Sequence, residues 1–134
     1  MTDTFRSILL VDDDLTLREM YFERLKAEGF TVEMAKDGEE ALAKAADIKP
    51  SIILLDIMMP KINGLDVLRK LKEGEVTKNI PVIVLTALIQ DREKMESITR
   101  GADDYIVKSE MMPGDVINKV KALLNDPKPK PTEE

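Results

Sequence analysis

The 134-residue sequence contains no histidine and no cysteine. Without histidine, the chain has no Ser-His or Cys-His catalytic pair, no His-ligated zinc and no phosphohistidine of its own. Without cysteine, it has neither disulfide bonds nor thiolate metal sites. Any chemistry must therefore use Asp, Glu, Lys, Ser, Thr or Tyr side chains.

Long apolar runs are also absent. The longest ones have the length of a strand, well short of the roughly 20 residues that a membrane helix needs. Residues Met1 to Arg6 lack the basic start and the apolar stretch of a signal peptide. Together with the absence of cysteine, these features lead us to expect a cytoplasmic protein that does not enter a membrane.

The composition is that of one soluble globular domain. Hydrophobic residues make up 43% and charged residues 34% of the chain, which excludes a disordered protein. The formal net charge of −6 argues against direct binding to nucleic acid, because gripping phosphates requires clustered Lys and Arg. The charge favours a protein partner or a cation instead.

Five short apolar runs alternate with stretches of helical spacing. Several runs are nearly continuous Ile, Leu and Val, which is typical of parallel strands buried on both faces. The pattern predicts β-α repeated five times, hence an α/β fold with a doubly wound five-stranded parallel sheet. The expected strands are Ser7–Val11, Thr31–Ala35, Ser51–Leu55, Pro81–Leu85 and Asp104–Val107.

The helical stretches carry apolar stripes and end signals. Asp14 stands where the N-cap of the first helix belongs, and Gly29 where that helix ends. Leu42, Ala45 and Ala46 predict the buried face of the second helix. The fourth helix, about Gln90 to Arg100, is the least apolar. We expect it to be loosely packed and exposed.

Reactive side chains follow the predicted strands. In open parallel α/β sheets, sites form at the carboxyl ends of the strands. Two carboxylates about 4 Å apart at an effective dielectric near 20 repel by about 4 kcal/mol, so a converging cluster indicates a hard cation such as Mg²⁺. A carboxylate, a metal, an ammonium and a hydroxyl are the groups that phosphoryl transfer requires. The candidates are Asp12, Asp13 and Asp14 after the first strand, Asp56 after the third, Thr86 after the fourth and Lys108 after the fifth.

Four segments strengthen this interpretation. They read ILLVDDD, IILLDIMMPKINGLDVL, PVIVLTA and GADDYIVK. In residues and in spacing they resemble the motif blocks of the receiver domains of two-component response regulators, from about Ile8 to Leu124. The resemblance implies a flavodoxin-like fold with strand order 2-1-3-4-5. It also implies a phosphorelay signalling role rather than an enzyme's role, in which the receiver assists its own Mg²⁺-dependent phosphorylation and dephosphorylation.

The resemblance assigns a role to each candidate. Asp56 would accept the phosphoryl group, and Asp13 and Asp56 would ligate Mg²⁺ directly. Asp12 would act mainly through water. The backbone carbonyl of Met58 would be a further ligand. Thr86 would bond the phosphoryl group, and Lys108 would pair with it. Tyr105 would be the switch aromatic, which moves inward when Thr86 moves.

The resemblance likewise implies partners. The phosphoryl donor would be a histidine kinase or a histidine phosphotransfer protein, and phosphorylation would alter a protein-binding face. The output would be a downstream protein target or a domain absent from this chain, and a dimer that forms on phosphorylation is a further expectation. Residues 1–125 would form the receiver domain. The Pro- and charge-rich segment Asp126–Glu134 would be a flexible tail or linker.

The sequence departs from the family in one loop. Most members place proline after the lysine of the fifth strand, with a cis peptide, whereas Ser109 follows Lys108 here. Met112 stands where a capping residue is expected before Pro113. A cis bond before a residue other than proline costs about 2.5–4 kcal/mol. We therefore expect a trans Lys108–Ser109 peptide and a different loop path, with the Lys108 ammonium still reaching Asp56.

Two other functions compete with this one. A hydrolase with Asp56 as nucleophile, like the haloacid-dehalogenase phosphatases, would have a second acid two positions later, where Met58 stands. No glycine-rich nucleotide loop is present. A pseudo-receiver that takes no phosphoryl group would be expected to lack one of the acids or the lysine, and all of them are present.

Overall fold

The computed structural model describes residues 6–12, 14–57, 64–86, 102–107 and 113–125. Within these ranges, strands and helices alternate as the apolar pattern predicts. Their bounds are β1 (Ser7–Val11), α1 (Leu15–Ala27), β2 (Thr31–Ala35), α2 (Gly38–Ile48), β3 (Ile52–Asp56), α3 (Gly64–Glu73), β4 (Val82–Thr86), β5 (Asp104–Val107) and α5 (Pro113–Asn125). The expected helix over residues 90–100 lies outside the described residues.

The five strands form one parallel sheet in the order β2-β1-β3-β4-β5. This is the order that the resemblance implied. Strands β3 and β4 each begin and end one residue later than the apolar runs suggested. The shift makes Asp56 and Thr86 the last residues of their strands, so both are held in the hydrogen-bonded ladder.

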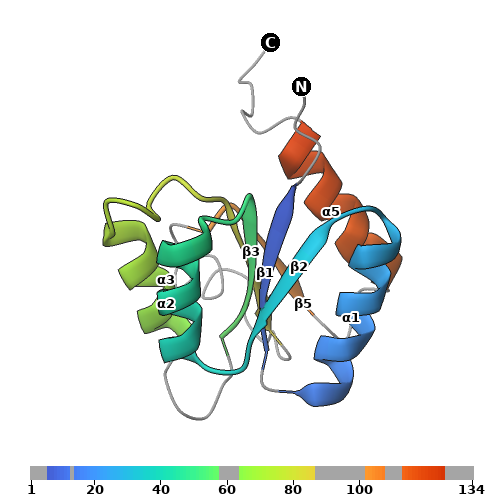
Figure 1. Cartoon of the computed structure of the whole chain (residues 1–134), viewed down its shortest axis with the longest axis horizontal. Coiled ribbons are helices and arrows are strands. Elements are labelled where there is room, and N and C mark those ends of the chain that lie inside the picture. Colours follow the sequence, from blue (N-terminus) through green and yellow to red (C-terminus); the bar gives the residue numbers. More distant parts are fainter. Residues whose placement is uncertain (1–5, 13, 58–63, 87–101, 108–112, 126–134) are drawn as a thin grey trace.

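Helices cover both faces of the sheet. In Figure 1, α2 and α3 lie on one side and α1 and α5 on the other. Alternate strand residues supply two separate cores, because successive side chains of a strand point to opposite faces. Leu9, Val11, Ile53, Leu55, Val82 and Val84 belong to the core under α2 and α3. Ile8, Leu10, Ile52, Leu54, Ile83, Leu85 and Ile106 belong to the core under α1 and α5.

Helix α1 begins and ends at the residues expected from the sequence. The side chain of Asp14 accepts a hydrogen bond from the backbone N–H of Leu17 (3.1 Å), as an N-cap does. After α1, Gly29 has a φ of 98°, the left-handed conformation that glycine adopts without strain. Helix α5 begins at Pro113, also as expected.

The buried face of α2 differs from the prediction. Ala41 and Ala45 are fully buried, Leu42 is half-buried and Ala46 is exposed. The prediction was therefore wrong for Ala46, because the buried face of α2 is rotated about the helix axis from the predicted one. A stripe of alanines has little hydrophobic contrast, and both candidate faces obey the same three- and four-residue spacing.

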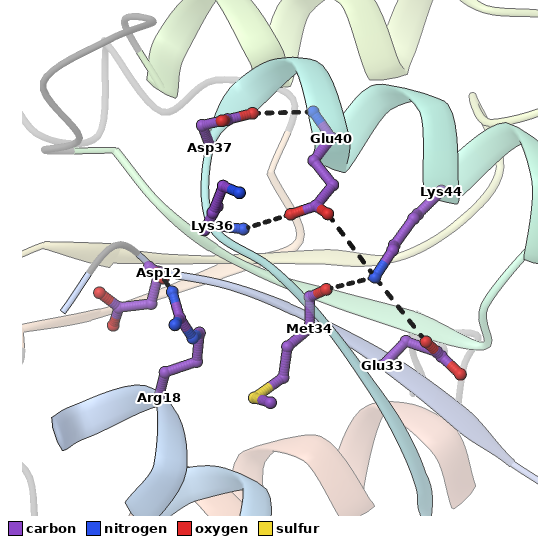
Figure 2. A network of polar contacts seen from close by, with 8 residues as sticks. All are labelled: Asp12, Arg18, Glu33, Met34, Lys36, Asp37, Glu40 and Lys44. Atoms are coloured by element: carbon purple, nitrogen blue, oxygen red, sulfur yellow. Dashed lines mark hydrogen bonds and ion pairs between the residues drawn. The ribbon is translucent and has the colours of Figure 1, made fainter. Parts of the chain in front are cut away.

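Lys44 ties α2 to the outermost strand, β2. Its ammonium donates to the carbonyl oxygen of Met34 (2.7 Å) and lies 3.9 Å from Glu33 and 4.0 Å from Glu40 (Figure 2). A carboxylate oxygen of Glu40 in turn accepts from the backbone N–H of Lys36 at 2.8 Å. The loop between β2 and α2 is thereby held at both ends.

Candidate functional site

Two carboxylates are buried where β1 and β3 end, at what we call the carboxyl edge of the sheet. Asp12 follows the last residue of β1 and is 0% exposed, and Asp56 is the last residue of β3 and is 3% exposed. Of all the charged side chains in the described part of the chain, these two are the buried ones. Burial of charge is costly unless it is compensated, so the pair marks this edge as the candidate site.

The register of the sheet brings the two acids together. Val11 pairs with Leu55, so the following residues, Asp12 and Asp56, occupy neighbouring positions on adjacent strands, about 5 Å apart. By alternation both belong to the face that carries Leu10 and Leu54, under α1 and α5. The register therefore places Asp12 and Asp56 at neighbouring positions, as expected from the sequence, and their roles at a metal site stay predictions.

The backbone of Asp12 is fixed on both sides. Its N–H donates to the carbonyl oxygen of Ala35 at the end of β2 (3.2 Å). Its own carbonyl oxygen accepts from Nη1 of Arg18 on α1 (2.8 Å), as Figure 2 shows. Oδ1 of its carboxylate accepts from the backbone N–H of Asp14 (2.9 Å). The backbone of Asp12 is thus held by the sheet and by α1, and its carboxylate is held by the N–H of the residue that caps α1.

The end of β3 is fixed by a close approach of α3. A Cβ placed on Gly64, the first residue of α3, would overlap Cα of Ile57 and lie 2.9 Å from the carbonyl oxygen of Asp56. The backbone N–H of Ile57 also donates to the carbonyl oxygen of Leu85 on β4 (3.1 Å). Because only glycine leaves room for this contact, the sequence at position 64 positions the backbone that carries Asp56.

Strands β4 and β5 complete the carboxyl edge. Thr86 is the last residue of β4 and pairs in register with Val107, while its neighbour Leu85 pairs with Asp56. The backbone of Thr86 therefore lies beside the end of β3, as expected. Tyr105 is half-buried on β5 and packs against the core under α2 and α3. Its role as a switch aromatic stays a prediction.

The remaining predicted site residues, Asp13, Met58 and Lys108, lie outside the described residues, as do the Lys108–Ser109 peptide and the tail 126–134. Their assigned roles stay predictions.

The donor chemistry at this edge fits a hard divalent cation. Carboxylate and carbonyl oxygens are the ligands that Mg²⁺ prefers, and the described donors are the carboxylates of Asp12 and Asp56. Within the described ranges no group of three or more acids is placed to hold a metal ion; Asp13, the third acid expected at the metal, lies outside these ranges. A cation would offset the repulsion between two buried carboxylates on adjacent strands.

Sequence reasoning missed two residues that hold the site, Arg18 and Gly64. Arg18 binds a backbone carbonyl, an interaction that leaves no pattern in the sequence. Gly64 is the first residue of α3, and a glycine directly before the apolar stripe of a helix is the sequence signal that suggests a steric requirement.

Comparison with known proteins decides the family. The profile described as the response regulator receiver domain matches residues 8–121, nearly the whole described chain. The chain belongs to the response-regulator receiver domains of two-component systems. This membership agrees with the fold, the strand order and the buried acids of the carboxyl edge.

Two curated relatives are similar over most of this receiver domain. The DNA-binding dual master transcriptional regulator RpaA of Synechocystis is 39% identical over 120 residues, covering 87% of this chain and 48% of the relative. The phosphate regulon transcriptional regulatory protein PhoB of Pseudomonas aeruginosa is 39% identical over 119 residues, covering 89% and 52%. The chain spans about half the length of these relatives.

Solved receiver structures have the same fold. A CheY-like receiver domain protein of Methanospirillum hungatei superposes with a TM-score of 0.81 at 30% identity, covering 91% of this chain and 95% of its own. The response regulator protein TrrA of Thermotoga maritima, solved in complex with Mg²⁺-BeF, gives a TM-score of 0.78 at 36% identity, covering 89% and 99%. The flavodoxin-like architecture is confirmed. Among the described helices, none has both the length and the apolar character needed to cross a bilayer.

Proposed function

We propose that Asp56 accepts a phosphoryl group from the phosphohistidine of a histidine kinase or phosphotransfer protein, in the presence of Mg²⁺. The observation that carries this proposal is the buried acid pair, Asp12 and Asp56, on adjacent strands of a receiver domain. The donor histidine lies outside these 134 residues, because they contain no histidine.

The transfer needs one bond to form and one to break. A carboxylate oxygen of Asp56 attacks phosphorus, the P–N bond to the donor imidazole breaks, and its electron pair returns to the imidazole nitrogen. Asp12, Asp13, Asp56 and the carbonyl of Met58 would hold Mg²⁺, which supplies positive charge for the phosphoryl oxygens. The Lys108 ammonium would pair with a phosphoryl oxygen.

The burial of Asp56 supports its role as nucleophile. A carboxylate that is 3% exposed has few competing water contacts, and β3 holds it at a fixed angle through the ladder to β4. Gly64 lets α3 pack directly on the adjoining backbone, so the acceptor has a rigid support. Rigid placement of a reacting group lowers the entropic part of the barrier.

The proposed output is a change in the proteins that this domain binds. The Thr86 hydroxyl would bond the new phosphoryl group, Tyr105 would follow inward, and a protein-binding face would change. The two named relatives are a DNA-binding transcriptional regulator and a transcriptional regulatory protein, each about twice the length of the matched region. We infer that this receiver acts through a downstream protein, a dimer formed on phosphorylation or an output domain elsewhere, as a cytoplasmic signalling protein.

The test is phosphorylation with acetyl phosphate and Mg²⁺, followed by intact mass. We expect one added phosphoryl group that hydroxylamine removes, and none in Asp56→Asn. Asp66→Asn is the matched control, because Asp66 is an exposed acid on α3, where its side chain is 53% exposed. It should label like the wild type.

Undiminished labelling of Asp56→Asn would place the acceptor elsewhere and contradict the proposal. A wild-type protein that takes no phosphoryl group, either from acetyl phosphate or from a panel of phosphorylated kinases, would instead make the chain a pseudo-receiver.

A further inference from the structure

The turn between β1 and α1 is closed by a ring of three hydrogen bonds. The N–H of Asp14 donates to Oδ1 of Asp12 at 2.9 Å, and the N–H of Arg18 donates to the carbonyl oxygen of Asp14 at 2.9 Å. Nη1 of Arg18 then donates to the carbonyl oxygen of Asp12 at 2.8 Å. The ring joins a buried carboxylate to the first turn of α1, and Figure 2 shows its bond between Arg18 and Asp12.

Arg18 supplies the bond of this ring that crosses from the helix back to the strand. Asp14 is already fixed, because its side chain caps α1 through the N–H of Leu17. Asp12 is held by β2 on its N–H side, through Ala35, so the Arg18 bond restrains its carbonyl side. A hydrogen bond from a guanidinium is charge-assisted and stronger than a neutral one.

We propose that Arg18 is a positioning residue for the metal-binding carboxylates, acting through the backbone of Asp12. This inference rests on the proposed function, because it concerns the Mg²⁺ site of that reaction. Arg18 fixes the peptide that leads from Asp12 to Asp13, the two acids that the family resemblance assigns to the metal. Groups that do not touch the metal but hydrogen-bond to its ligands, and so orient them, strongly affect metal affinity.

The direction in which Mg²⁺ affinity changes when Arg18 is replaced distinguishes a positioning role from a purely electrostatic one. If Arg18 acted only as a nearby positive charge, removing it would make the acid site more negative, and Mg²⁺ would bind more tightly. If Arg18 acts by holding Asp12, removing it loosens a ligand and Mg²⁺ binds more weakly. The side chain is half-exposed, so salt screens its charge, and we expect the positioning effect to dominate.

The first measurement is Mg²⁺ affinity of the unphosphorylated protein, followed by amide chemical shifts at physiological ionic strength. Arg18→Met keeps much of the stem but removes the charge and the donors, and it should bind Mg²⁺ about 10-fold more weakly. Arg18→Lys keeps the charge and one donor group, and its loss should be smaller. Arg24→Met is the matched control, since Arg24 is an exposed arginine on the same helix, and its affinity should not change.

The second measurement is hydrogen exchange without Mg²⁺. The amide of Asp14 donates to the Asp12 carboxylate, so it should exchange faster in Arg18→Met than in the wild type. The amide of Leu54, in the centre of β3, reports overall stability and corrects for it. A general loss of stability would accelerate both amides, whereas a loosened ring accelerates Asp14 beyond Leu54.

Mg²⁺ affinity equal to or tighter than wild type in Arg18→Met would overturn the assignment. So would Asp14 exchange that changes only in step with Leu54. If Arg18→Met does not fold, Arg18→Gln, which keeps an amide donor without charge, is judged by the same two outcomes. A wild-type protein that binds no Mg²⁺ contradicts the proposed function itself, whereas wild-type binding with an unaffected Arg18→Met contradicts the inference alone.

Discussion

The two ends of the sheet use aspartate in opposite ways. At the amino edge, where the strands begin, the Asp103 side chain is 40% exposed and 3.5 Å from Lys72, and the Asp104 side chain is 33% exposed and 2.8 Å from Lys119. At the carboxyl edge, Asp12 and Asp56 are 0% and 3% exposed. The first pair sits among lysines in partial contact with water, and the second pair is enclosed.

The amino-edge acids also complete the backbone ladder. Oδ2 of Asp103 accepts from the N–H of Val82 (2.8 Å), while the N–H of Asp103 donates to the carbonyl oxygen of Val82 (2.8 Å). Lys72 adds a bond to the carbonyl oxygen of Ile80 (3.0 Å). The amino-edge acids therefore form ion pairs and hydrogen bonds that stabilise the fold, whereas the carboxyl-edge acids are buried on adjacent strands, where we expect their mutual repulsion to oppose folding without a cation.

The largest expected change in stability tests how closely α3 packs against the carboxyl edge. Gly64→Ala places a methyl group against the backbone of Ile57, and it should lower the free energy of unfolding by about 3 kcal/mol in urea titrations. Gly114→Ala is the control, because its Cβ would meet only Arg24 at 3.9 Å. That change should be neutral or stabilising by up to about 1 kcal/mol. Equal losses at the two positions would contradict the close approach of α3.

The next effect tests whether the amino edge is purely structural. Asp103→Ala leaves the N–H of Val82 without its side-chain acceptor, and it should lower the free energy of unfolding by about 2 kcal/mol. Asp103→Asn keeps an oxygen acceptor and should lose less. Both variants should accept phosphoryl groups from acetyl phosphate at the wild-type rate. A slower rate would show that the two edges are coupled and that Asp103 is not purely structural.

The smallest effect has the opposite sign. Without Mg²⁺, Asp12→Asn should raise the free energy of unfolding by about 1–2 kcal/mol, because it relieves repulsion with Asp56 while an amide oxygen still accepts from Asp14. The same change should severely weaken Mg²⁺ binding, and Asp13→Asn should behave alike. Thermal melts with and without Mg²⁺ measure both quantities. A variant that melts lower and binds Mg²⁺ normally would show that the acids do not act together.

The sequence was sufficient for features that repeat or stand at strand ends. Short apolar runs located all five strands to within a residue, and Asp12 and Asp56 were expected at the carboxyl edge because parallel strands end on one side. Asp14 could equally be predicted as the N-cap, since a capping side chain has a fixed place before a helix. Strand order came from the family resemblance, because periodicity carries no information on which strands are neighbours.

Features that depend on one close contact could not be predicted from the sequence. The buried face of α2 was misjudged at Ala46, because alanines on neighbouring stripes bury similar area and only packing against the sheet decides between them. Nothing local reveals that Arg18 reaches the carbonyl of Asp12, or that α3 approaches Ile57 so closely at Gly64. These contacts join segments whose separation is set by the whole fold.

Lys44 has a consequence for the behaviour of the protein at high concentration. Among the described strands, β2 pairs with β1 alone, and alternation directs the carbonyl of Met34 away from β1, to the open side. An unused row of backbone groups on such a strand invites another chain to add itself and begin aggregation. The Lys44 ammonium occupies that acceptor at 2.7 Å, so an incoming strand would have to displace a charge. A neutral residue at position 44 would leave the protein folded but more prone to aggregate at high concentration.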